Sequence, residues 1–283
     1  MEEIYYDVRR SFFSLCVRVF WIKKRTHFCK SVRQNVYRNV ILSREYTHGI
    51  HMVVFFFITF GQKPSVKTQR EILENIGSRQ KGFGGKGTNE TDAKKKKKKK
   101  KKKNHSFNVD EEDVGKTKNF TNFAKKTKSC CYAIDETKVL LGTNGDVDYE
   151  KAKSALKSWK QFQLGWTEVD EATRVRKGQK VCVMIQPFPR VWLLNPLEIT
   201  YVSEEKKKSY SFAHTTLQGH LLAGEEKFTV EKDLQNDRVY FKVETFSKPD
   251  HILAKVMYPA VRALQKIFGA HAGFEMKKAV RNM

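Results

Sequence analysis

His220, Glu225 and Glu226 form a compact cluster of acid and base side chains in the last third of the chain. An imidazole can accept a proton while a neighbouring carboxylate orients it, so this spacing is compatible with acid–base catalysis by His220 and Glu226. In strands, however, polar side chains more often hydrogen-bond to nearby backbone. We therefore favour a structural role, with His220 satisfying buried backbone groups and the glutamates facing water. Catalysis by His220 and Glu226 is the alternative.

The sequence contains no metal site or further catalytic motif that we recognise. Cys130 and Cys131 are adjacent and lack the two-residue spacer of a zinc knuckle. The glycine-rich run at residues 82–88 lacks the ending of a phosphate-binding loop, and no Gly-x-Ser-x-Gly elbow is present. The five cysteines are an odd count without regular spacing, which does not describe a disulfide framework. We therefore expect a reducing compartment. We therefore expect neither a metal nor a cofactor.

The strands that must position the cluster surround it in the sequence. Gly219 and Gly224 lie inside a strand pattern, where glycine marks a bulge or a close approach of two backbones. Residues 227–231 and 239–244 alternate apolar and polar side chains, and residues 233–237 between them are turn formers. This pattern predicts an antiparallel hairpin directly after the cluster.

A long helix is predicted after the hairpin. Pro249 ends the second strand, and from residue 251 the apolar side chains recur every three or four positions. Pro259 removes one backbone hydrogen bond inside this helix and is expected to kink it. Arg262 and Gln265, one turn further on, could hold the polar head of a ligand.

Earlier elements complete an α+β pattern. Residues 149–162 have the spacing of an amphipathic helix. Residues 181–185 are apolar on both faces, which predicts a central strand. Pro196 predicts a bend or an edge in the next strand.

Several of these motifs together resemble one known family. They are Thr216-Leu-x-Gly-His220, Gly224-Glu-Glu-x-Phe228, Phe246-Ser-Lys-Pro249 and Pro259-x-x-Arg262-x-x-Gln265. The combination is similar to the family named domain of unknown function 1990, and most similar to its plant branch. The resemblance extends from about residue 139 to residue 276 and departs from the family pattern at Thr215 and Asp250.

The resemblance implies a helix-grip-like fold, in which an antiparallel β-sheet wraps around a long C-terminal helix and encloses an apolar cavity. We expect aromatic and polar residues from both layers to line this cavity. The candidate pocket residues are Trp159, Trp166, His220, Glu226, Tyr240, Phe246, Tyr258, Arg262 and Gln265. The candidate structural residues are Gly219, Gly224, Pro249 and Pro259.

The N-terminal part differs in charge from the predicted fold. Residues 1–103 contain 26 Lys and Arg against 8 Asp and Glu, whereas residues 104–283 contain 29 against 23. We interpret residues 1–51 as a non-native or unstructured extension and residues 52–83 as the first segment of the family-like region. Residues 84–128 are predicted to be a disordered polar linker, and residues 129–283 an α+β domain. Ten consecutive lysines, from Lys94 to Lys103, repel one another within that linker.

These observations favour a non-enzymatic module that binds an apolar or amphipathic small molecule between the sheet and the C-terminal helix. Nucleic acid is expected to bind only non-specifically, through Lys94 to Lys103. The resemblance to the plant branch implies an alternative, an ion-conducting protein of the plastid outer envelope, and with it membrane association. The expected location is accordingly the cytoplasm or that envelope.

Deleting residues 94–103 should leave the melting temperature unchanged, because the lysine run adds charge but no apolar packing. Nucleic-acid binding by the full-length protein should be weak, salt-sensitive and lost with the run. Differential scanning fluorimetry and filter binding at two salt concentrations measure both. A large drop in melting temperature would mean that the run docks against an acidic surface.

Overall fold

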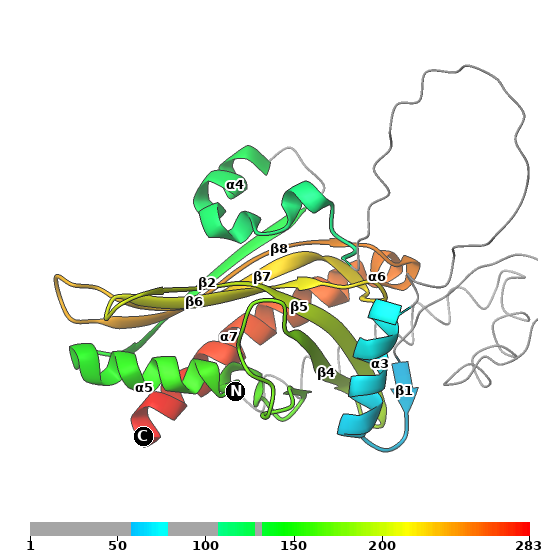
Figure 1. The fold of residues 1–283 in the computed structure, drawn as a ribbon, viewed down its shortest axis with the longest axis horizontal. Coiled ribbons are helices and arrows are strands. Elements are labelled where there is room, and N and C mark those ends of the chain that lie inside the picture. The colour runs from blue at the N-terminus through cyan, green and yellow to red at the C-terminus, as the bar shows by residue number, and fades with distance from the viewer. Residues whose placement is uncertain (1–57, 79–106, 128–131) are drawn as a thin grey trace, which may run out of the picture.

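The structure is a computed structural model that describes residues 58–78, 107–127 and 132–283. One curved antiparallel sheet carries the other elements, with helices on both of its faces (Figure 1). The predicted extension at residues 1–51 and the lysine run at residues 94–103 lie outside the described residues.

The sheet follows the order β2-β8-β7-β6-β5-β4-β3, and β1 pairs with β5. Its strands are β1 (Ile58–Phe60), β2 (Ala133–Gly142), β3 (Thr167–Glu168), β4 (Lys180–Phe188), β5 (Val191–Glu205), β6 (Ser209–Thr216), β7 (Leu222–Lys232) and β8 (Val239–Pro249). The predicted hairpin is confirmed as β7 and β8, in which Phe228 pairs with Val243 and Val230 pairs with Phe241.

The concave face of the sheet holds the main core. The helices that pack there are α5 (Gly145–Lys157), the short η5 (Lys160–Phe162) and α7 (Tyr258–Asn282). Phe212, Phe228 and Phe241 point into this core from three neighbouring strands and are fully buried. The predicted architecture, an antiparallel sheet wrapped around a long C-terminal helix, is therefore confirmed.

Helix α7 lies directly on β2 because two of its residues lack side chains. A Cβ at Gly269 would come within 2.7 Å of Thr137 Oγ1, and one at Gly273 within 2.5 Å of Val139 Cγ2. Both distances are shorter than van der Waals contact. The two glycines therefore set how closely the helix approaches the sheet.

The convex face is covered by a segment for which the sequence predicted no structure. Residues 107–127 contain η3 (Glu111–Asp113), η4 (Lys116–Asn119) and α4 (Phe120–Thr127). Phe123 of α4 packs 4.7 Å from Phe246, measured between ring centroids. The predicted polar linker over residues 84–128 is therefore wrong for residues 107–127. Their few apolar side chains give no clear period, but these side chains meet apolar residues of the sheet.

A buried carboxylate attaches this segment to the sheet. Glu225 is only 2% exposed. Its oxygens accept hydrogen bonds from the backbone N–H groups of Gly115 (2.7 Å) and Thr117 (3.0 Å). Three hydroxyl groups donate to it as well, from Thr117 at 2.5 Å, Thr200 at 3.2 Å and Thr215 at 2.6 Å. The interpretation that both glutamates face water is therefore wrong for Glu225, because its desolvation is offset by these five donors.

The predicted C-terminal helix is divided in two. Helix α6 (Ile252–Val256) ends at Met257, and α7 begins at Tyr258 with Pro259 in its first turn. Proline is well placed in a first turn, where its missing N–H would have no intrahelical partner. Pro259 therefore starts α7 and does not kink it. Similarly, the helix predicted over residues 149–162 ends early, because Trp159 adopts a left-handed conformation with φ 59°.

Two strand predictions also differ from the structure. Strand β4 lies next to β3 near one edge of the sheet. It is apolar on both faces because α3 (Val66–Ser78) covers Cys182 and Met184 on the side away from the core. Strand β5 continues through Pro196 without a break. The Asn195 amide there donates to the Val183 carbonyl at 3.2 Å, which helps to hold β5 against β4.

Neither Gly219 nor Gly224 forms a bulge. Gly219 has φ +94° and lies in a turn that the hydrogen bond from His220 N–H to Leu217 O closes. Gly224 pairs in regular register with Ser247 of β8, but a Cβ there would be 2.2 Å from the carbonyl oxygen of Phe246. The glycine at 224 therefore marks a close approach of two backbones.

Gly219→Ala and Gly224→Ala should each destabilise the protein by about 1 kcal/mol or more. Gly224→Ala should cost more, because its clash is with backbone, whereas Gly219→Ala meets an unfavourable φ. Urea unfolding of both variants beside Ser203→Ala, an exposed strand position, measures the difference. Equal stability of Gly224→Ala and the parent would contradict the close approach.

Glu225→Gln should lower the free energy of unfolding by roughly 2 kcal/mol or more, because an amide NH₂ would face donors that now share a carboxylate. Glu205→Gln is the matched control, since that exposed side chain should contribute under about 0.5 kcal/mol. In Glu225→Gln the amides of Gly115 and Thr117 should also exchange faster with deuterium. Unchanged exchange at both amides would show that Glu225 does not hold the segment.

Candidate functional site

A cavity of about 200 Å³ lies between the concave face of the sheet and α7. Its wall is mostly apolar and comes from η5, the sheet and α7. The apolar side chains of the wall include Phe162, Trp166, Ile185, Val243, Leu264 and Phe268. Most polar residues of the wall gather in two groups, one on β6 and β7 and one between β2, β8 and α7.

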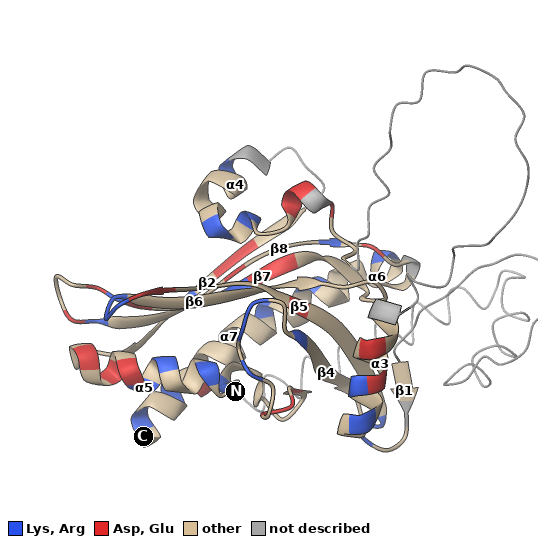
Figure 2. Cartoon of the chain, viewed as in Figure 1, with Lys and Arg blue, Asp and Glu red and all other residues tan. Residues whose placement is uncertain are grey.

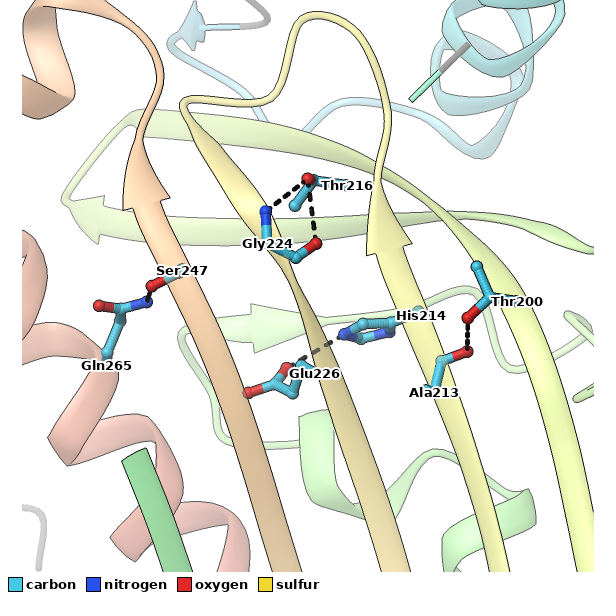
Figure 3. Close-up of polar contacts among 8 residues, drawn as sticks. All are labelled: Thr200, Ala213, His214, Thr216, Gly224, Glu226, Ser247 and Gln265. Carbon is cyan, nitrogen blue, oxygen red and sulfur yellow. Dashed lines mark hydrogen bonds and ion pairs between the residues drawn. The ribbon is translucent and has the colours of Figure 1, made fainter. Parts of the chain in front are cut away.

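The first polar group is a pair of residues opposite each other on neighbouring strands. His214 of β6 pairs in register with Glu226 of β7, and His214 Nε2 lies 3.1 Å from Glu226 Oε2 (Figure 3). His214 is 2% exposed, and its Nδ1 is buried without a hydrogen-bond partner. This geometry favours the neutral tautomer in which Nε2 carries the proton and donates to Glu226, because a proton on Nδ1 would meet no acceptor.

Thr216 closes the same end of the β6–β7 ladder. Its hydroxyl accepts from Gly224 N–H at 3.0 Å and donates to Gly224 O at 3.1 Å (Figure 3). The hydroxyl thus replaces a backbone partner where the two strands separate. It keeps polar backbone groups satisfied at the border of an apolar cavity.

The second polar group joins α7 to β2 and β8. Both terminal nitrogens of Arg262 lie 2.6 Å from carboxylate oxygens of Asp135, and Arg262 Nη1 also donates to Gln265 Oε1 at 2.7 Å. Gln265 Nε2 donates to Ser247 Oγ at 2.9 Å (Figure 3). The hydrogen bonds that Arg262 donates to Asp135 raise the pKa of Arg262. Arg262 therefore forms an ion pair with Asp135, and it does not line the cavity.

His220 borders the cavity but does not pair with Glu226. Its Nδ1 accepts a hydrogen bond from Leu222 N–H at 2.9 Å, and burial lowers its pKa to about 3. His220 is therefore neutral at physiological pH. The alternative that couples His220 to Glu226 as an acid–base pair is not supported by their contacts, because Glu226 binds His214.

Five of the nine candidate pocket residues border the cavity: Trp166, His220, Glu226, Phe246 and Gln265. The ring of Phe246 nevertheless packs on the convex face, 5.2 Å from the ring of Tyr132. The Trp166 indole N–H donates to His271 Nδ1 at 3.2 Å, which fixes the ring beside α7.

The other four candidates lie elsewhere. Trp159 is fully buried in the core, where its Nε1 donates to Thr173 O at 2.7 Å. Tyr240 lies on the convex face, with Lys138 Nζ 4.0 Å from the centre of its ring. Tyr258 begins α7 and does not line the cavity, and Arg262 binds Asp135. Aromatic character alone therefore did not identify the wall.

His214 is the most informative of the site residues that sequence reasoning missed. It belongs to β6, where Tyr210, Phe212 and His214 share one face because side chains alternate along a strand. The signal was therefore present in the apolar residues two and four positions earlier.

Within the described residues, no group of three or more His, Cys, Asp or Glu is placed to hold a metal ion.

A further observation concerns membranes. In the ranges 58–78, 107–127 and 132–283, no helix is long and apolar enough to cross a bilayer.

Several solved structures resemble this fold at low similarity. The Zhui aromatase/cyclase of Streptomyces sp. R1128 matches with a TM-score of 0.39 and 10% identity, over 53% of this chain and 94% of its own. Norcoclaurine synthase of Thalictrum flavum matches with a TM-score of 0.35 and 13% identity, over 53% and 95%. At these TM-scores no ligand or reaction can be transferred.

Sequence relatives are much closer. A UPF0548 protein of Arabidopsis thaliana is 42% identical over 154 residues, which cover 53% of this chain and 74% of the relative. A UPF0548 protein of Dictyostelium discoideum is 30% identical over 160 residues, which cover 53% and 73%. The family described as domain of unknown function (DUF1990) matches residues 113–274, more than half of the chain. The chain therefore belongs to the DUF1990 family.

Proposed function

We propose that this protein binds a small amphipathic molecule in the cavity between the sheet and α7. The observation that carries the proposal is an apolar cavity with polar groups at only a few places on its wall. Binding sites for small molecules typically combine these two properties. The proposed role is binding, and no catalysis is assigned to it.

The apolar part of the ligand would lie against rings and aliphatic side chains. Phe162 and Phe268 lie 5.2 Å apart between ring centroids, and Trp166 and Phe268 lie 6.5 Å apart. These rings offer surfaces for a flat apolar group. For size, an engineered apolar cavity of ~150 Å³ holds benzene, so a single ring with a short chain suits this cavity.

Two polar side chains of the wall are placed to bind the polar end of the ligand. Glu226 presents a carboxylate from the sheet, and Gln265 presents an amide from α7. Both side chains are held by a neighbour, His214 in one case and Ser247 in the other. Preorganised polar groups of this kind orient a ligand without a large loss of side-chain entropy.

The two alternatives receive less support. Catalysis by His220 and Glu226 requires their cooperation, and each is hydrogen-bonded to another group. The ion-conducting role in the plastid outer envelope stays a prediction from the family resemblance, since no contact described above favours it.

Leu264→Trp should fill the cavity and abolish binding of phenethyl alcohol, a probe with one ring and a short polar chain. For a ligand of this size, the parent should bind with a Kd of roughly 0.1–1 mM. Lys266→Trp, an exposed position on the same helix, is the control and should bind like the parent. Titrations of the full-length protein followed by ¹⁵N–¹H NMR report the affinity and the affected residues. Shifts outside the cavity, or equal binding by Leu264→Trp, would overturn the proposal.

A further inference from the structure

The charged residues of the cavity wall are all acidic. Asp135, Glu225 and Glu226 belong to the wall, whereas no Lys or Arg side chain lines it in the part of the chain that the structure describes. Asp135 belongs to β2, and Glu225 and Glu226 belong to β7; Figure 2 shows acidic stretches of both strands in red. Residues 104–283, which contain the whole wall, have 29 Lys and Arg against 23 Asp and Glu, so an acidic wall does not follow from their overall charge.

The three carboxylates differ in how far neighbouring groups compensate their negative charge. Asp135 forms a two-point ion pair with Arg262. Glu225 points to the convex face and is held by N–H and O–H dipoles from Gly115, Thr117, Thr200 and Thr215. These dipoles stabilise its charge but do not neutralise it. The region behind the cavity wall therefore stays negative.

Glu226 is the carboxylate that a ligand can reach. Its Oε2 accepts from His214, and its Oε1 makes no hydrogen bond with any residue that the structure describes. The side chain keeps 21% of its surface exposed at the cavity. Of the neighbouring imidazoles, His220 adds no positive charge because burial lowers its pKa to about 3, and His214 Nδ1 lies against no acceptor among the described residues that could bind a second proton. Glu226 thus presents a negative charge in a mostly apolar space without a cationic partner.

We infer that the ligand is an organic cation, namely an amine on a small apolar body, whose ammonium group binds Glu226. A partly buried carboxylate gains most from a charged hydrogen-bond donor, because the low local dielectric strengthens the contact. An anionic ligand would instead face Glu226 and the field of Glu225. This inference rests on the proposed function, since it specifies the ligand of the same cavity.

Three probes that share a phenyl ring and a two-carbon chain test the inference: phenethylamine, phenethyl alcohol and hydrocinnamate. At pH 7 they are cationic, neutral and anionic, respectively. Titration of the full-length protein by NMR should rank the amine first, about tenfold tighter than the alcohol, and hydrocinnamate last. If the alcohol binds and the amine binds no tighter, the inference is overturned while the proposed function stands. If none of the three binds, the proposed function fails.

Glu226→Gln removes the charge and should reduce the advantage of the amine over the alcohol to less than about threefold. Glu205→Gln removes the same charge at an exposed position and should keep the parent's ranking. An unchanged advantage in a folded Glu226→Gln variant, verified by its NMR spectrum, would show that another group selects the amine. The ranking in the unmodified protein tests the inference even if Glu226→Gln does not fold.

Discussion

The carboxylate of Glu225, buried on the convex face, is the interaction on which the arrangement of the site depends. Five donors converge on it, three from the segment at residues 107–127 and one each from β5 and β6. Side chains alternate along a strand, and a shift by one residue would turn the whole strand over. With Glu225 held outward, the side chains of Glu226 and Phe228 must point inward. The hydrogen bonds of Glu225 on the convex face thus determine which residues of β7 lie on the concave face.

The fold could be predicted from the sequence wherever the apolar side chains follow a single period. Alternation in residues 227–231 and 239–244 identified the β7–β8 hairpin, because one face of each strand packs on the core. Residues 107–127 were missed, because their structure depends on distant partners such as Glu225 and Phe246. Pro259 was misplaced within one long helix, since apolar spacing continues across the break at Met257. The local spacing of apolar residues does not show such contacts between residues that lie far apart in the sequence, or such breaks in a helix.

The site could be predicted only in part, for a related reason. Glu226, Gln265 and Trp166 were identified from their chemistry and from motifs, and all three border the cavity. Residue type did not show which face a side chain occupies, so Tyr240 was assigned to the wrong side of the sheet. His214 was overlooked although Phe212, two residues earlier, points into the core. For strand residues, the register is a better guide to a cavity than aromatic character.

The contact between α7 and β2 has a consequence for the order of folding. Strand β2 pairs with β8 across about 100 residues of chain, as between Val139 and Phe241, and such distant contacts form slowly because the loop must close first. The glycines that let α7 rest on β2 also weaken the helix by about 1 kcal/mol each relative to alanine. Before it docks, α7 therefore has little helical stability of its own. We therefore expect α7 and β2 to form together, late in folding and in one cooperative step.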